Sequence, residues 1–397
     1  MTLALLVGAV VDPEDGTSGP SAVFVDNGTV TAIVPGHDAP EDATVLDHRD
    51  ATLVPGLIDA HVHLNLRADG EMMANIAKPS DDELVETTLA NARVALRGGI
   101  TTVRDVGSKT DTGFAARRAG DAASLPHLLL AGPPITTTAG HGWFFGGVAD
   151  GEAGVRDRVD LQIDAGADWI KVMATGGGTP GTIPWEPSYS EAELASIVGA
   201  AHARGVKVTM HCLSAEGMRR AVRAGADHIE HAGFATDGAG GSAFDAELAD
   251  AMAEAGVVVT PTLSVRLYMR DHQIALGADA ATVDAWQRRF DNGMSQFAKL
   301  AAAGVRYAAG TDAGWHRSPF DSLATEIACI AECGPGAAAA FRSATSATAE
   351  HFGMTGHGRV RAGAPADLVL IDGNPTRDIA ALGRVRGVLR AGKFVAR

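Results

Sequence analysis

The sequence of 397 residues is poor in cysteine, with Cys212, Cys329 and Cys333 as its three thiols. An odd and sparse set of cysteines argues against a disulfide framework and favours a reducing compartment, so we expect a cytoplasmic protein. No apolar run approaches the ~20 residues of a membrane-spanning helix. No basic residue precedes the first apolar run, MTLALLVGAVV, so we expect no signal peptide and no membrane partner.

Basic residues are also in deficit, because 33 Lys and Arg face 48 Asp and Glu and give a formal charge of −15. A field of this sign repels phosphate, which argues against nucleic acid and anionic membranes as partners. A small-molecule substrate is the expected partner, and a homo-oligomer is left open. The hydrophobic share of 46% allows a large core.

The chain changes its pattern near residue 57 and again near residue 357. Both ends are rich in short β-like runs, and Asp26-Asn27-Gly28 is typical of a hairpin turn. Between them, short apolar runs alternate with Ala-rich helical stretches, which predicts a parallel sheet and, with eight repeats, a (β/α)₈ TIM barrel. We therefore predict an α/β chain with a barrel over 57–356 and a small β-sandwich domain from 1–56 plus 357–397. The eight runs are 57–64, 100–106, 127–135, 168–175, 207–212, 228–233, 257–265 and 306–314.

Polar residues at the C-terminal ends of barrel strands are the candidates for chemistry. The first run ends with His61-Val62-His63, whose imidazoles share one side of a strand and can hold one cation. The alternative is a pair of hydrogen-bonded core histidines, which is the commoner situation for an isolated His-x-His.

The fourth run carries Lys171 in an apolar context. A buried ammonium is costly unless it is paired or neutral, and a neutral amine can combine with CO₂ to give a carbamate that bridges two cations. The alternative is a lysine paired with a carboxylate. Arg104 and Asp105, which end the second run, are expected to form a structural ion pair.

The fifth and sixth runs end with His211 and His231, which suits a second cation. His228 lies three residues before His231, so strand alternation predicts that it faces away, and Glu230 with it. Asp312 ends the eighth run, where a carboxylate can bind a metal and accept a proton from bound water. The alternative for Asp312 is a cap for the next helix.

The joint order of these residues resembles the amidohydrolase superfamily, in its binuclear branch with a carboxylated lysine. Residues 54–63 (VPGLIDAHVH) are similar to its first-strand signature, and residues 363–369 (GAPADLV) to its C-terminal signature. Residues 170–177 (IKVMATGG) and 229–231 (IEH) resemble the imidazolonepropionase-related group, which includes Xaa-Pro dipeptidase-like and ochratoxin-hydrolase-like members.

The resemblance implies two divalent metal ions, usually zinc, and a bridging N-carboxylated Lys171. It assigns His61 and His63 to one ion and His211 and His231 to the other, and it makes Asp312 a ligand and the general base. The implied reaction is attack of a metal-bound hydroxide on an amide-type C–N bond.

Two Gly-rich loops, 136–151 and 176–190, follow the third and fourth runs and should face the site. His141 is a candidate catalytic donor to the substrate. Candidates for substrate contact are Trp143, Trp185, Tyr189 and His316. Peptidase-like members often carry a tyrosine shortly after the fifth-strand histidine, whereas here Cys212 and Leu213 follow.

Three functions compete. The favoured one is metal-dependent hydrolysis of a peptide, N-acyl amino acid, cyclic amide or carbamate. A deaminase of the same superfamily typically lacks the bridging lysine and has a glutamate after the fifth-strand histidine, so Lys171 argues against it although Glu216 follows His211. A non-catalytic barrel used for binding should have lost ligands, and the expected set is complete.

Overall fold

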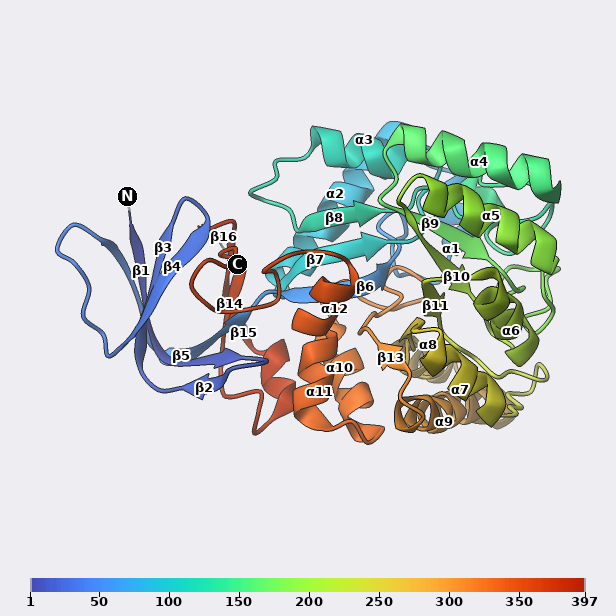
Figure 1. Cartoon of the computed structure of the whole chain (residues 1–397). Coiled ribbons are helices and arrows are strands. Elements are labelled where there is room, and N and C mark those ends of the chain that lie inside the picture. Colours follow the sequence, from blue (N-terminus) through green and yellow to red (C-terminus); the bar gives the residue numbers. More distant parts are fainter. Residues whose placement is uncertain (1, 396–397) are drawn as a thin grey trace.

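The computed structural model describes residues 2–395, so residues 1, 396 and 397 of the predicted small domain lie outside the described residues. Figure 1 shows an end sheet built from both termini beside a larger body of parallel strands wrapped by helices. The change in pattern seen in the sequence therefore corresponds to a change in architecture.

The strands of both chain ends share one eight-stranded sheet with the order β16-β15-β14-β5-β1-β3-β4, in which β2 pairs with β1. The junction is antiparallel pairing of β14 with β5, with Leu368 opposite Pro55. The expected pairing between the ends is thus present, but hydrogen bonds join the strands in one sheet and not in a sandwich of two. The strands are β1 (Leu3–Asp12), β2 (Gly16–Ser18), β3 (Ser21–Asp26), β4 (Thr29–Pro35), β5 (Thr44–Pro55), β14 (Leu368–Ile371), β15 (Val385–Arg390) and β16 (Lys393–Val395).

The predicted hairpin turn lies between β3 and β4. Asn27 and Gly28 both have positive φ, 48° and 77°, as a two-residue hairpin turn with the twist of its strands requires. Antiparallel pairing of Asp26 with Thr29 closes the turn and confirms the prediction.

Each of the eight predicted runs contains a parallel strand. They form two sheets, β6-β7-β8 and β9-β10-β11-β12-β13. Single parallel bridges join the sheets, Ile135 to Val172 at one gap and Val62 to Ala313 at the other, so the strands follow barrel order without one continuous ladder. The strands are β6 (Leu57–Val62), β7 (Ile100–Asp105), β8 (His127–Leu130), β9 (Trp169–Met173), β10 (Lys207–His211), β11 (His228–Glu230), β12 (Val258–Thr260) and β13 (Arg306–Tyr307).

Helices connect the parallel strands and cover their outer side (Figure 1). Two of them, α2 and α5, begin with the capping box Ser-x-x-Glu, at Ser80 and Ser190, which satisfies free N–H groups of the first turn. The helices are α1 (Met72–Ala77), α2 (Asp81–Arg97), α3 (Thr112–Ala119), α4 (Gly151–Ala165), α5 (Glu191–Ala203), α6 (Ala215–Ala224), α7 (Ala246–Glu254), α8 (Ser264–Ala275), α9 (Ala280–Ala302), α10 (Leu323–Glu332), α11 (Gly336–Ser343) and α12 (Ser346–His351), with 3₁₀ turns at Trp143–Phe145 and Ile379–Gly383.

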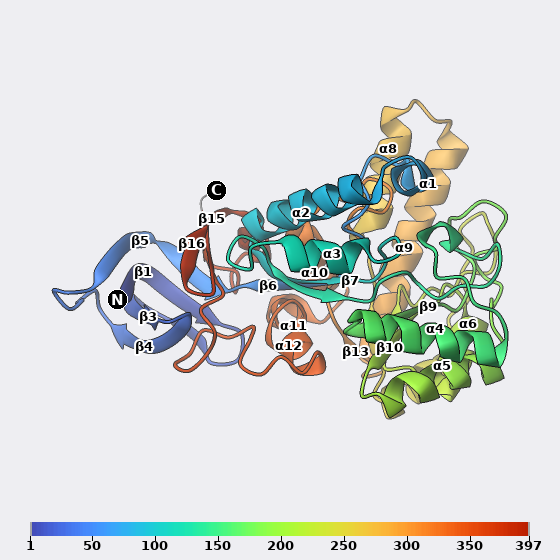
Figure 2. The same ribbon diagram turned by 90° about the horizontal axis from the view of Figure 1, so that it is seen from above.

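The main apolar core lies between the parallel strands and these helices, with Val103, Ile170 and Met210 completely buried. Figure 2 shows α8 and α9 as a helical pair that projects beyond the rest of the body. Within residues 2–395, no helix combines the length and apolarity needed to cross a membrane.

Candidate metal centre and substrate cavity

A cavity of about 450 Å³ opens at the C-terminal ends of the parallel strands. The structure brings the six predicted ligands together on it, although they lie on or after five different strands and span 252 residues of sequence. They are His61, His63, Lys171, His211, His231 and Asp312.

Three of these residues point atoms at one another. The Nε2 atoms of His61 and His63 lie 3.3 Å apart, and Oδ1 of Asp312 lies 3.3 Å from the first and 3.4 Å from the second. This carboxylate oxygen is buried and has no hydrogen bond of acceptable geometry among the described residues. Two imidazole nitrogens and an unsatisfied carboxylate oxygen within 4.8 Å of one another form a group that could hold a metal ion.

The outer nitrogens of this pair are occupied by acceptors. His61 Nδ1 lies 2.8 Å from Oε2 of Glu230, and His63 Nδ1 lies 3.2 Å from the carbonyl oxygen of Gly107. Because a carboxylate and a carbonyl can only accept, both Nδ1 atoms carry a proton, so in the neutral form of each ring the Nε2 lone pair faces the cavity. Such outer contacts fix the tautomer of metal-binding histidines.

The rings of five histidines follow one another across the floor of the cavity. Neighbouring centroids are 5.2 Å apart for His63 and His61, 5.1 Å for His61 and His231, 4.6 Å for His231 and His211, and 4.7 Å for His211 and His141. Burial lowers the pKa of His211 and of His231 well below the usual value, and the neighbouring rings add to the effect on His211. These imidazoles are therefore neutral, the state in which histidine binds metals.

Lys171 lies beside these rings, and its side-chain amine has neither an ion pair nor a hydrogen bond within residues 2–395. Burial lowers its pKa to about 8, although the charges of Glu230 and Asp312 act in the opposite direction. The expectation of a lysine paired with a carboxylate is therefore not met. An amine with a lowered pKa is neutral more often than an ordinary lysine, and the neutral amine is the form that reacts with CO₂.

Close backbone approach between β13 and β6 positions Asp312. The N–H of Asp312 donates to the carbonyl of His61 at 2.9 Å, and the Thr311 hydroxyl donates to Asp59 at 2.7 Å. A Cβ at position 310 would lie 2.8 Å from the His61 nitrogen, so only glycine fits there. Asp312 has φ of 56°, which is strained for a non-glycine residue and typical of functional positions.

The prediction that His228 and Glu230 face away from the barrel interior is wrong. Both side chains are completely buried, and Glu230 contacts His61 directly. Strand alternation holds within β11, where His228 and Glu230 share the inner side. It fails at His231, because a φ of 68° turns the chain and brings this third side chain inward too.

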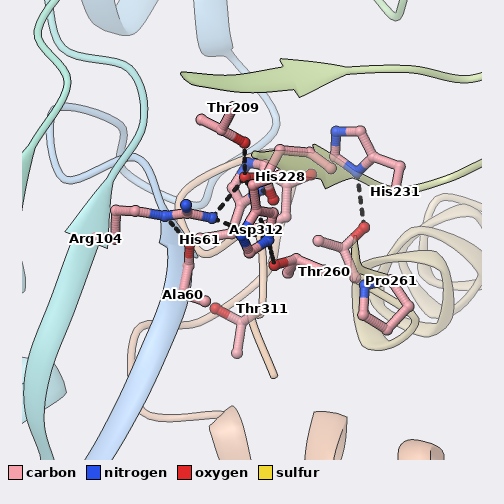
Figure 3. A network of polar contacts seen from close by, with 12 residues as sticks. Ala60, His61, Arg104, Thr209, His228, His231, Thr260, Pro261, Thr311 and Asp312 are labelled. Carbon is pink, nitrogen blue, oxygen red and sulfur yellow. Dashed lines mark hydrogen bonds and ion pairs between the residues drawn. The ribbon is translucent and has the colours of Figure 1, made fainter. Parts of the chain in front are cut away.

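The predicted ion pair between Arg104 and Asp105 is also wrong. Successive strand residues point to opposite sides, and Arg104 points inward, where its Nη2 lies 2.6 Å from Oε1 of Glu230. Asp105 instead accepts the N–H groups of Leu64 and Gly107. Figure 3 shows the Arg104 guanidinium directed toward the centre of this network, near His61 and His228.

Charge balance in this network follows from these contacts. Burial opposes ionisation of Glu230, but the charges of Arg104 and His61 hold its pKa well below the usual value. Burial likewise opposes ionisation of Asp312, and His61 and His63 hold its pKa well below the usual range. Both carboxylates are therefore anionic at neutral pH.

His141 lies at the edge of the cavity, where Thr179 fixes its orientation. Its Nδ1 is 2.8 Å from the Thr179 hydroxyl oxygen, which also accepts the N–H of Gly142 at 3.0 Å. The hydroxyl hydrogen is thus available to Nδ1, which leaves Nε2–H as the free donor of His141. Burial, with the charge of Lys171, lowers its pKa to about 3, so the ring is neutral.

The predicted substrate contacts divide into two groups. Trp185 and His316 line the cavity. Trp143 and Tyr189 do not: Trp143 is 43% exposed, and the Tyr189 hydroxyl donates to the carbonyl of Ala149 at 2.8 Å. Sequence reasoning missed the lining residues on the α8 and α9 pair and in the preceding loops, because helical spacing marks them only as core. Those that matter below are Phe234, Val265, Arg266, Met269, Trp286 and Phe297.

Comparison with known proteins identifies the family of this chain. The description "Amidohydrolase family" matches residues 52–395. This chain belongs to the amidohydrolase family. It is thereby a hydrolase of carbon–nitrogen bonds, as the sequence predicted.

Individual relatives of this amidohydrolase are distant in sequence and close in fold. It is 26% identical to the ochratoxinase of Aspergillus niger, over 98% of this chain and 85% of that protein. A crystal structure of an Xaa-Pro dipeptidase with bound methionine superposes with a TM-score of 0.88 at 28% identity, covering all of both chains. A prolidase complexed with N-methylphosphonate-L-proline gives 0.86 at 30% identity, again over all of both chains.

Proposed function

We propose that this amidohydrolase cleaves an amide-type C–N bond, in a peptide, N-acyl amino acid, cyclic amide or carbamate, with two divalent metal ions, zinc by preference. The observation that carries the proposal is the convergence of His61, His63 and the unsatisfied Oδ1 of Asp312, with Lys171 unpaired beside them. The dipeptidase and ochratoxinase relatives support hydrolysis of amide bonds.

The donor set fits two ions. His61 and His63 would hold one with Asp312, His211 and His231 would hold the other, and Lys171 as a carbamate would bridge them. Imidazole and carboxylate ligands suit zinc and related divalent metals. When bound, such ions supply Lewis acidity and lower the pKa of water.

The chain's own residues supply the proton chemistry. Asp312 is anionic, so it can accept a proton from the attacking water and return it to the leaving nitrogen. His141 offers its Nε2–H at the edge of the cavity, where it would donate to the substrate carbonyl oxygen or carboxylate. Aromatic and aliphatic side chains around the cavity exclude bulk water, which strengthens these polar contacts.

A deaminase is less well supported. Glu216, the glutamate after the fifth-strand histidine, lies on α6 and binds Arg219 and Arg220 at 3.0 and 2.9 Å. It does not line the cavity, so it has no route to a substrate nitrogen.

Trp143 and Tyr189 are not part of the proposed substrate site, because they lie away from the cavity.

We also infer the larger architecture from the strand order. The two bridges between the parallel sheets support a (β/α)₈ barrel over 57–356, and pairing of β5 with β14 supports a small domain from 1–56 and 357–397. Three free thiols support a cytoplasmic location.

Metal counting tests the proposal. Zinc-loaded wild type should contain two ions per chain, and Lys171→Met at most one, because the bridge is lost. Lys207→Met is the matched control, since Lys207 also lies on a parallel strand, at the start of β10, but away from the cavity. This variant should keep both ions. Two ions in Lys171→Met would refute the bridge, and a metal-replete enzyme inactive on dipeptides, N-acyl amino acids, lactams and carbamates would refute the activity.

A further inference from the structure

The wall of the cavity opposite the β-strand floor is mostly apolar. It is formed by α8, α9 and the loop before α7, with Phe234, Val265, Met269, Trp286, Phe297 and Leu300. Two cationic side chains, Arg266 and Arg289, also line this wall. Burying a guanidinium in apolar surroundings costs free energy unless it is paired and hydrogen-bonded, so the partners of Arg266 matter.

One nitrogen of the Arg266 guanidinium is hydrogen-bonded to the backbone. Its Nη1 donates to the carbonyl oxygens of Pro261 and Thr262, at 3.1 and 2.8 Å. The guanidinium plane packs against Gly293. A Cβ at this position would lie 3.3 Å from the guanidinium carbon. The other edge, Nε and Nη2, forms no hydrogen bond within residues 2–395. That edge has the fork geometry that binds a carboxylate with two parallel hydrogen bonds.

No carboxylate of the chain neutralises Arg266 by direct contact in the described part of the structure. Glu326 and Asp312 are the carboxyl groups near it, but Glu326 accepts the N–H groups of Leu263 and Ser264, and Asp312 faces His61 and His63. The other arginine of the wall, Arg289, is different, because it stacks on Trp286 at 4.6 Å. Arg266 therefore has no carboxylate partner in direct contact among the described residues.

Arg266 is connected to the floor of the cavity through one residue. The Thr262 carbonyl accepts from Arg266, and the Thr262 hydroxyl lies 2.7 Å from Nδ1 of His231. Arg266 and His231 also line the same cavity, so a group bound by Arg266 there would share the cavity with the predicted metal ligands.

We propose that Arg266 binds a carboxylate of the substrate, so that the substrate class is an N-acyl amino acid or dipeptide and not a neutral lactam, carbamate or urea. This inference rests on the proposed hydrolysis of an amide. The apolar wall would hold the side chain next to that carboxylate. In these surroundings the bidentate contact is stronger than it would be in water.

The test compares two probes that differ at one group, N-benzoyl-L-phenylalanine and N-benzoyl-L-phenylalaninamide. Calorimetry on the zinc-loaded enzyme gives both affinities, and kcat/KM for release of benzoate gives turnover. Wild type should favour the acid. In Arg266→Met, affinity for the acid should fall roughly 10- to 100-fold, the usual range for a hydrogen bond to a charged group, with the amide unchanged within about threefold.

Two further variants exclude a merely structural role. Arg266→Lys keeps the charge without the fork and should lose part of the preference. Arg270→Met removes an arginine from the same helix but outside the cavity, where it binds Asp271 and Gln287, and should change neither affinity.

Equal binding of acid and amide by wild type would overturn the proposal, and so would equal weakening of both probes in Arg266→Met. Failure of the proposed function is distinguishable. An enzyme that binds the acid through Arg266 but hydrolyses neither probe keeps the carboxylate site and loses the assigned reaction.

Discussion

Replacement of Glu230 by glutamine should destabilise the protein and weaken metal binding at the same time. Its carboxylate accepts from Arg104 Nη2 at 2.6 Å, from His61 Nδ1 at 2.8 Å and from the Thr209 hydroxyl. Both Glu230 and Arg104 are completely buried. An amide has one oxygen and no charge, so the buried guanidinium loses its counter-charge.

The magnitude follows from what remains around Arg104. Its Nε donates to the Ala60 carbonyl at 2.7 Å and its guanidinium lies 4.5 Å from the ring centre of Trp169, but Nη1 already lacks a partner. Removing one partner of a buried ion pair costs about 3–5 kcal/mol. Stabilities of natural domains are about 5–15 kcal/mol, so this is a large share. Loss of the acceptor at His61 should weaken metal binding by about 10- to 100-fold.

Urea unfolding of the metal-free protein and zinc competition with a chelator measure the two effects separately. Glu326→Gln is the matched control, because Glu326 is equally buried but has backbone N–H groups as partners and contacts no guanidinium within residues 2–395. Glu230→Gln should lose at least about 2 kcal/mol more than Glu326→Gln. Equal losses, together with zinc affinity within threefold of wild type, would contradict the assignment of Glu230 as the residue that positions His61.

Two further changes have defined outcomes. Asp312→Asn should keep the fold but lower kcat by roughly 10²–10⁴-fold, because an amide cannot accept a proton, and near-normal turnover with the metals in place would remove Asp312 from the mechanism. Burial raises the pKa of Glu326 from 4.5 to about 7, so the folded state holds this proton to higher pH than the unfolded chain. The associated stability is complete below pH 4.5 and is lost as pH rises through 7, by about 3 kcal/mol. The unfolding free energy of wild type relative to Glu326→Gln should fall by that amount over this range, and a flat difference would contradict the shifted pKa.

The sequence predicted the strands and the residues that meet on the floor of the cavity because both depend on short-range rules. Period-2 alternation placed His61 and His63 on one side of β6, and the alternation of runs and helices placed Lys171, His211 and Asp312 at the same end of the parallel strands. Those rules operate within one strand and its ends. They require no knowledge of what packs against it.

The errors arose where a local rule ended. Alternation was extended from β11 to His231, whose φ of 68° interrupts it, so His228 and Glu230 were assigned to the wrong side. The pairing of Arg104 was assigned to its sequence neighbour, whereas its partner Glu230 is 126 residues away. A buried guanidinium finds the carboxylate that shares its side of the sheet, and that partner depends on the strand register.

The residues of the cavity wall were harder to predict from sequence than those of its floor. Trp143 and Tyr189 were chosen because they follow site residues in sequence, but sequence proximity fixes the backbone and not the direction of a side chain, and both turn away from the cavity. Arg266 and Trp286 come instead from α8 and α9, where helical spacing by itself is typical of packing residues. The floor holds the groups of the proposed reaction, and the order of the strands along the chain is enough to find its residues. The wall, to which we assign substrate selection, depends on how a projecting helical pair packs over the strand ends, which is why the reaction class was predictable from sequence and the proposed carboxylate site was not.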